Sequence, residues 1–228
     1  MVYRLHKTLY GLKQAPRAWN KRIDQFFIQI GFKKCAVEFG VYVQSFKNED
    51  MMIICLYVDD LLIIGSKTSE IDKVKGKLKS EFEMADLGEL SFILGMKFLK
   101  VKDGVVMHQQ KYIGELLEKI EMNGYNSLSN PSETNSKLDE CSNEEKVDST
   151  MFRQMVGSLR YVCNNRPDIC YSVSVISKFM HDPRKPHLIV AKRILRYLKG
   201  TLEYGLLFPN CTHGEGCALV GYSNSDWC

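Results

Sequence analysis

Residues 51–65 have the sequence MMIICLYVDDLLIIG, in which two adjacent aspartates, Asp59 and Asp60, separate two apolar runs. Both runs have the composition of buried strands, so a sharp turn at the acids predicts an antiparallel hairpin. Two neighbouring carboxylates repel each other and lose hydration beside apolar residues, so something must stabilise them. On the residues alone they could be protonated, paired with basic side chains, solvated at a protruding turn, or bound to a divalent cation such as Mg²⁺.

The pattern around this hairpin predicts a mixed α+β arrangement with antiparallel strands. A helix is expected from Pro16 to Gly31, because proline suits a first helical turn and apolar residues then recur at helical spacing. The other elements predicted in this part are strands at 39–46 and 51–57, a helix at 71–82, a strand pair turning at Asp103 and Gly104, and a helix at 113–120.

The chain has 228 residues, 45% hydrophobic and 25% charged, a globular composition that excludes collagen-like, coiled-coil and fully disordered proteins. Residues 124–148 carry six acids, two lysines and few large apolar side chains, so we expect an acidic flexible linker there. The linker separates residues 1–123 from a second part. That part has predicted helices at 149–163, 167–180 and 186–199 and predicted strands at 205–208 and 217–222.

The longest apolar run stops at Asp59, well short of the roughly 18 residues that a membrane helix needs. The N-terminus also lacks the continuous apolar stretch of a secretory signal. We therefore expect an intracellular, cytoplasmic protein with no membrane partner. The eight cysteines include no C-x-x-C pair, so they are expected to be reduced.

Basic residues are concentrated at the start of the chain, where residues 1–34 hold eight Lys and Arg against the single acid Asp24. The predicted helix 186–199 adds a basic face that includes Lys192, Arg193 and Arg196. Such a distribution favours a polyanionic partner, nucleic acid before membrane. A solvated, lysine-rich surface is the alternative.

Several long motifs narrow the interpretation. They are LYGLKQAPRAW at 9–19, YVDD at 57–60, FEMADLGELSFILGM at 82–96, RPDI at 166–169 and AKRILRYLKGT at 191–201. In order and spacing they resemble the Pol polyprotein of copia-type LTR retrotransposons. The resemblance implies a reverse transcriptase palm and thumb fragment over 1–123, a connection region over 149–216, and the truncated start of a ribonuclease H domain over 217–228.

The resemblance also implies roles for particular residues in RNA-directed DNA polymerisation with two Mg²⁺ ions. Asp59 and Asp60 would be the catalytic metal ligands, and Asp226 would be a vestigial ribonuclease H ligand. The residues implied at the nucleotide and primer are Tyr57, Gln14, Lys13, Gly95 and Met96. Those implied at the nucleic-acid backbone are Arg17, Lys21, Arg22, Lys192, Arg193 and Arg196. The expected partners are an RNA template, a DNA primer and a dNTP, together with the upstream part of Pol or a second copy of the chain. The expected location is the cytoplasm, the nucleus or retrotransposon particles.

Two departures from the family pattern leave a second function open. Family members carry another catalytic aspartate on an upstream palm strand, before the motifs with which this sequence starts, and they commonly have an acid where Asn224 stands. Asp24 is expected on a helix, so it does not replace the upstream acid. The expectation for the isolated chain is therefore a non-catalytic nucleic-acid-binding remnant, with polymerase activity in a longer chain as the other hypothesis.

Overall fold

The computed structural model describes residues 11–46, 50–133, 138–139, 141 and 143–210. The chain forms two compact units, Met1–Glu89 and Leu90–Cys228, each with its own antiparallel sheet and helices. The α+β class expected from the sequence is confirmed. No helix in the described part of the chain is long and apolar enough to cross a bilayer.

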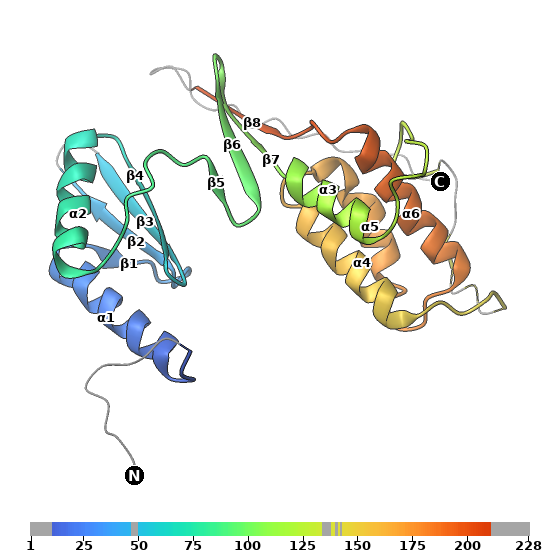
Figure 1. Cartoon of the computed structure of the whole chain (residues 1–228), viewed down its shortest axis with the longest axis horizontal. Helices are drawn as coiled ribbons and strands as arrows, with labels where there is room; N and C mark the ends of the chain where they lie inside the picture. Colours follow the sequence, from blue (N-terminus) through green and yellow to red (C-terminus); the bar gives the residue numbers. More distant parts are fainter. Residues whose placement is uncertain (1–10, 47–49, 134–137, 140, 142, 211–228) are drawn as a thin grey trace, which may run out of the picture. The chain divides into compact units, whose positions relative to one another are not determined.

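The first unit is a four-stranded antiparallel sheet with two helices (Figure 1). Its strands lie in the order β1-β2-β3-β4, so the hairpin predicted at the two acids, β3–β4, shares strand β3 with a second hairpin, β2–β3. The elements are α1 (Ala15–Gln29), β1 (Lys33–Lys34), β2 (Val41–Ser45), β3 (Met51–Tyr57), β4 (Asp60–Gly65) and α2 (Thr68–Glu81).

Both helices cover the same face of this sheet. On α1 the buried residues Ile23, Phe26 and Phe27 recur at helical spacing, and on α2 Val74 and Leu78 do the same. They pack against alternate residues of the strands, which are Tyr42, Met52 and Ile54. Each such side chain contributes about 1.5–3 kcal/mol when fully buried, so this face holds the unit together.

Asp24 lies on α1, as the sequence predicted, and it has structural partners there. Its carboxylate accepts hydrogen bonds from Lys34, at 2.7 Å, and from the buried Tyr42, at 2.9 Å. The bond from Lys34 is the main reason that the pKa of Asp24 is lowered, while burial and the same carboxylate raise the pKa of Tyr42. Asp24 therefore joins α1 to β1 and β2.

The second unit combines a small sheet with a helical bundle. Its elements are β5 (Phe92–Ile93), β6 (Met96–Val101), β7 (Gly104–His108), α3 (Gln110–Lys119), α4 (Ser149–Val162), the 3₁₀ helix η2 (Pro167–Ile169), α5 (Cys170–Ser177), α6 (Lys185–Gly200) and β8 (Leu206–Pro209). The strand order is β5-β6-β7-β8. The described cysteines, Cys35, Cys55, Cys141, Cys163 and Cys170, are free thiols.

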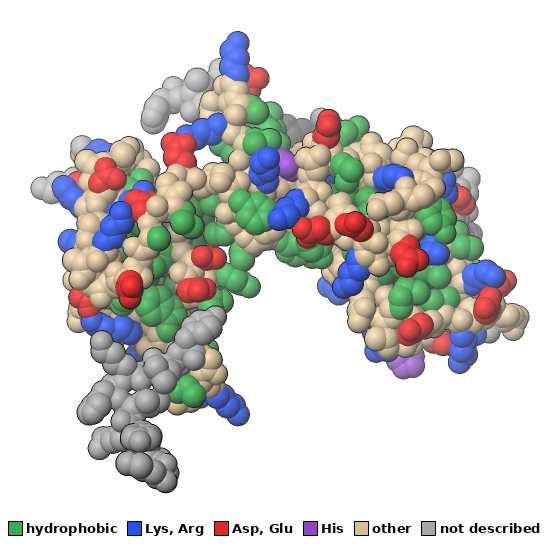
Figure 2. All heavy atoms as spheres, in the orientation of Figure 1, with side chains coloured by type: hydrophobic (Ala, Val, Ile, Leu, Met, Phe, Trp, Pro, Cys, Tyr) green, Lys and Arg blue, Asp and Glu red, His purple; other side chains and the backbone are tan. Residues whose placement is uncertain are grey.

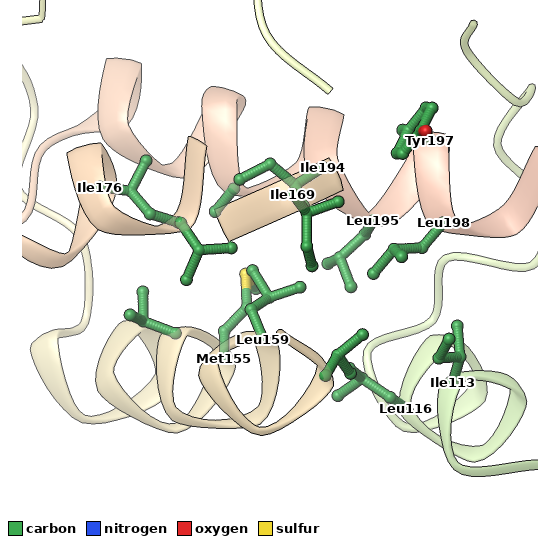
Figure 3. Close-up of a cluster of buried hydrophobic side chains, with 14 of the residues drawn as sticks. Ile113, Leu116, Met155, Leu159, Ile169, Ile176, Ile194, Leu195, Tyr197 and Leu198 are labelled. Atoms are coloured by element: carbon green, nitrogen blue, oxygen red, sulfur yellow. The ribbon is translucent and has the colours of Figure 1, made fainter. Parts of the chain in front are cut away.

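Residues from all four helices of the bundle meet in one core (Figure 3). Met155 and Leu159 of α4 point toward Ile194 and Leu195 of α6, and Leu116 enters from α3 at one end. Leu159, Ile194 and Leu195 are fully buried. Such close-packed interiors lose several kcal/mol when a large side chain is truncated.

Two features of this unit were not predicted from the sequence. β8 returns to pair with β7, with Val105 opposite Phe208, so the strand predicted at 205–208 belongs to the sheet of β5–β7. The boundary between the units falls after Glu89, which places the expected linker 124–148 inside the second unit. The strand predicted at 217–222 lies outside the described residues.

The buried guanidinium of Arg166 connects two parts of the bundle. Arg166 is 2% exposed and bonds to the Asp168 carboxylate, at 2.7–3.2 Å, and to the carbonyl and hydroxyl oxygens of Thr201, at 2.8 and 2.6 Å. The rings of Tyr197 and Tyr204 lie 5.5 and 5.3 Å from it. A buried charge is tolerated when its donors are satisfied in this way, so Arg166 links η2 to the end of α6.

Candidate functional site

The two aspartates lie at the tip of the β3–β4 hairpin. Tyr57 pairs with Asp60, so the connecting loop consists only of Val58 and Asp59. Val58 has a φ of +54°, a left-handed conformation that is rare for a β-branched residue. Such a residue costs about 1–3 kcal/mol and persists only where its surroundings impose it, most often at functional sites.

Trp19 of α1 contacts Val58 and helps to impose its conformation. Its indole Nε1 donates a hydrogen bond to the carbonyl oxygen of Val58, at 2.6 Å. The Trp19 ring is held in turn by an edge-on contact with Phe82, with ring centroids 5.4 Å apart. The tip of the hairpin is therefore tied to α1 through the backbone of the strained residue.

Trp19→Phe tests this tie. We expect the variant to unfold about 1 kcal/mol more easily in denaturant, because one hydrogen bond is lost while the ring contact with Phe82 remains. Amide hydrogen exchange at residues 57–60 should accelerate more than exchange elsewhere in the unit. Lys21→Gln, on the same helix, is the control and should change neither quantity. Unchanged exchange at the tip in Trp19→Phe would show that the indole does not hold the hairpin.

Both carboxylates are exposed at this tip. The side-chain carboxylates of Asp59 and Asp60 make no ion pair or hydrogen bond with another described residue, so the described part of the chain shows no basic partner for them. Two exposed carboxylates are hard oxygen ligands that leave room for water, a donor set that suits Mg²⁺. Among the described residues, no third acid, histidine or cysteine joins them in a cluster.

The residues assigned to the nucleotide lie near the same end of the unit. Gln14 is the residue before α1, and its side chain makes no capping bond, so its amide remains available. It lies roughly 7.5 Å along the helix axis from Trp19, because a helix rises 1.5 Å per residue. Lys13 precedes it and is exposed, and the Tyr57 side chain is 55% exposed beside the loop.

The basic residues of α1 divide into two groups. Arg17 and Lys21 are exposed, and they lie about 160° around the helix from Trp19, away from the contact with the hairpin. Arg22 forms an ion pair with Glu81 of α2 and lies 5.8 Å from the Phe82 ring. Of these three basic residues, therefore, only Arg17 and Lys21 have a charged group with no partner among the described residues.

The basic face of α6 is contacted by residues 125–133, in the first part of the segment of residues 124–148. Arg193 bonds to Glu133, at 2.7 Å, and to Asn130, at 2.8 Å, and Arg196 donates to the Asn126 carbonyl, at 2.7 Å. Lys192 lies 5.8 Å from the ring of Tyr125. All three basic residues are half-buried. Arg193 and Arg196 donate to groups of the chain itself, which reduces what they can offer to a phosphate.

The surface of the helical unit shows the same mixing of charge. In the view of Figure 2, basic and acidic side chains are interspersed over this unit, with no uniformly basic face in the visible part. Farther along the segment, Lys185 pairs with Glu145, at 3.1 Å, and Lys146 with Asp182, at 3.7 Å. The segment is thus attached to the bundle at both ends.

Arg193→Met tests this attachment. We expect the variant to lose about 1–2 kcal/mol of unfolding free energy, because Glu133 and Asn130 lose charge-assisted bonds while the aliphatic packing is kept. Lys178→Met, an exposed cation of the same unit without a described ion pair, is the control and should be neutral within about 0.5 kcal/mol. If both variants unfold at the same denaturant concentration as the original chain, the contacts of Arg193 do not hold the segment.

The residues assigned to the primer form the turn between β5 and β6. Gly95 has a φ of +78°, and Met96 begins β6. They belong to the second unit, whereas the hairpin with the aspartates belongs to the first. Asp226 lies outside the described residues, as does the expected start of a ribonuclease H domain.

Two features of the site were missed in the sequence. Helical spacing predicts for Trp19 only a place among the apolar residues of its helix, although its position in the motif at 9–19 is a usable signal. The left-handed conformation of Val58 had no signal, because a β-branched residue in a strand-like run predicts extended backbone.

The comparison with known proteins decides the family. A profile described as "Reverse transcriptase (RNA-dependent DNA polymerase)" matches residues 1–134. The chain belongs to the reverse transcriptase family. It is 36% identical over 226 residues to the retrovirus-related Pol polyprotein from transposon RE1 of Arabidopsis thaliana, and 39% identical over 236 residues to that from transposon TNT 1-94 of Nicotiana tabacum. No solved structure matches significantly.

These matches include 99% of this chain but only 15% of the RE1 polyprotein and 17% of the TNT 1-94 polyprotein. The resemblance to copia-type Pol polyproteins is therefore confirmed over essentially the whole chain. It includes the second unit, which extends beyond the reverse transcriptase profile.

Proposed function

We propose that this chain supplies the YVDD hairpin of an RNA-directed DNA polymerase, with Asp59 and Asp60 as Mg²⁺ ligands for nucleotidyl transfer. The observation that carries the proposal is the hairpin tip. A two-residue loop with a left-handed Val58, fixed by Trp19, presents two exposed carboxylates side by side in sequence. A two-residue hairpin needs left-handed backbone, yet a β-branched residue is an unfavourable choice for that conformation. Membership of the reverse transcriptase family supports a catalytic reason for this loop.

Bound Mg²⁺ would supply Lewis-acid stabilisation of charge on the reacting phosphate and the primer hydroxyl. The contribution of this chain is to hold the Asp59 and Asp60 oxygens at a fixed position. Because the two acids are solvated and unpaired with described residues, they can bind metal without breaking an existing ion pair. The hydrogen bond from Trp19 limits the motion of the loop that carries Asp59.

The proposed substrates are a dNTP, a DNA primer and an RNA template. Gln14, Lys13 and Tyr57 would contact the nucleotide and the primer end, and Gly95 and Met96 the primer strand. Arg17 and Lys21 would bind the nucleic-acid backbone, since their charges have no described partner. The contacts of Lys192, Arg193 and Arg196 favour a structural role for them over a direct phosphate contact.

Primer extension on an RNA template tests the proposal. The chain spans only 17% of the TNT 1-94 polyprotein, so the assay uses two proteins. One is the 228-residue chain, and the other is a chimera, the TNT 1-94 polyprotein in which this chain replaces the matching residues. We expect the chimera to extend the primer, and we expect this extension to require Mg²⁺ and to stop when EDTA is added. A chimera that stays inactive while the parent polyprotein extends the primer would contradict the proposal and favour the non-catalytic, nucleic-acid-binding alternative.

A further inference from the structure

The turn between β5 and β6 has an unusual backbone. Ile93 pairs with Met96, so Leu94 and Gly95 form a two-residue loop. Both loop residues have positive φ, +50° for Leu94 and +78° for Gly95. Tight hairpins of this kind need left-handed residues, and glycine adopts that conformation freely whereas leucine does not. The turn therefore depends on support from outside the loop.

Tyr161 of α4 provides that support. Its hydroxyl donates a hydrogen bond to the carbonyl oxygen of Leu94, the residue with the unfavourable φ. A Cβ on Gly95 would lie 2.9 Å from the same hydroxyl oxygen, so the close approach of Tyr161 requires glycine at this position. The contact joins residues far apart in sequence, and both belong to the second unit.

The ring of Tyr161 is itself held in place. It packs edge-on against Tyr112 of α3, with centroids 4.7 Å apart and an angle of 71° between the rings. Its neighbour on α4, Val162, is fully buried in the core of the bundle. The hydroxyl thus projects from a rigid support, which is what a residue needs in order to fix a loop.

We propose that Tyr161 is a positioning residue that holds the Leu94–Gly95 turn in the conformation in which it contacts the primer strand. This inference rests on the proposed function, because it needs Gly95 and Met96 at the primer. Tyr161 lies outside residues 1–134, the part matched by the reverse transcriptase profile, and belongs to the second unit together with the turn that it supports. Its effect passes through the turn and requires no contact between Tyr161 and nucleic acid.

Tyr161→Phe is the decisive variant, since it removes the hydroxyl and keeps the ring packed on Tyr112. Two quantities are measured on the 228-residue chain: amide hydrogen exchange across residues 92–98, and the rate at which a labelled RNA–DNA primer–template dissociates. We expect faster exchange at the turn and dissociation faster by roughly three- to tenfold, since such changes appear mainly in the off-rate. The melting temperature should change little.

Tyr112→Phe is the matched control, because it removes the hydroxyl of the neighbouring tyrosine, for which the described residues offer no hydrogen-bond partner. It should leave both quantities unchanged. Gly95→Ala should reproduce the effect of Tyr161→Phe, and the two changes combined should have less than the sum of their separate effects, because both act on one contact.

The outcomes separate the two proposals. Exchange at the turn that is the same in Tyr161→Phe and the original chain overturns the positioning role. Faster exchange with unchanged dissociation also overturns it, because the turn would then not hold the primer. An original chain that binds no primer–template overturns the role proposed for Tyr161, while the proposed function itself is decided by primer extension in the chimera.

Discussion

Asp59→Asn should lower the rate of primer extension by about 10³-fold or more, which corresponds to roughly 4 kcal/mol of activation free energy. The amide keeps the size of the side chain but removes the negative charge that binds Mg²⁺. Because Asp59 is exposed and has no ion pair with a described residue, the fold should be unaffected, and the unfolding free energy should stay within about 0.5 kcal/mol. Affinity for a primer–template should be unchanged or slightly higher, because one negative charge is gone.

The control for this experiment is Asp72→Asn. Asp72 is also an exposed carboxylate of the first unit, on α2, and forms no ion pair with a described residue. It removes the same charge from the unit, so a general electrostatic effect on nucleic-acid binding would appear in both variants. Extension that falls equally in Asp59→Asn and Asp72→Asn would remove the catalytic assignment of the hairpin.

The largest effect on stability should come from Asp168→Asn. The variant leaves the guanidinium of Arg166, which is 2% exposed, without its carboxylate partner. Breaking a buried ion pair on one side costs about 3–5 kcal/mol, and we expect the lower end because the Asp168 side chain is 33% exposed. Tyr197→Phe removes only the hydroxyl bonded to the same carboxylate, at 2.7 Å, and should cost about 1 kcal/mol. Equal unfolding midpoints for Asp168→Asn and Tyr197→Phe would contradict this ranking.

The same ion pair predicts a dependence of stability on pH. Burial acts to raise the pKa of Asp168, but hydrogen bonds from Arg166 and Tyr197 outweigh it and leave the pKa below its ordinary value of 3.8. The unfolded state then binds the proton first as the pH falls. The stabilisation is complete above about pH 4 to 5 and is lost as the pH falls from there through the lowered pKa. Unfolding measured from pH 6 to pH 3 should show a shallower acid decline in Asp168→Asn than in the original chain.

Local patterns predicted most of the elements correctly. The apolar runs on either side of Asp59 and Asp60 predicted the β3–β4 hairpin, and the buried stripe of α1 was visible in the spacing of Ile23, Phe26 and Phe27. These features depend on residues that are close in sequence, which is why a single sequence contains them.

Long-range pairings could not be predicted in the same way. The pairing of β8 with β7 depends on the bundle returning the chain to the sheet, and no residue of β8 indicates its partner. The acidic composition of residues 124–148 favoured a flexible linker, yet their backbone carbonyls and acids bind Arg193 and Arg196. Partners far away in sequence thus compensate for a segment that has few apolar residues of its own.

The sequence predicted the types of residue at the site better than their arrangement in space. The acids of the hairpin were apparent from the motif, while the strain at Val58 and the bond from Trp19 required the structure. The basic residues of α6 are visible in the sequence, but the sequence does not indicate that Arg193 and Arg196 bond to residues of the chain itself.

Metal binding at the hairpin is the most direct measurement. Mn²⁺, used as a paramagnetic substitute for Mg²⁺, is titrated into the chain with primer–template and a dNTP, and bound Mn²⁺ is counted by electron paramagnetic resonance. If Asp59 and Asp60 are metal ligands, Asp59→Asn should weaken binding by about tenfold or more, whereas Asp72→Asn should bind like the original chain. Equal affinity and equal stoichiometry in the original chain and Asp59→Asn would contradict the assignment of the YVDD hairpin as the metal site.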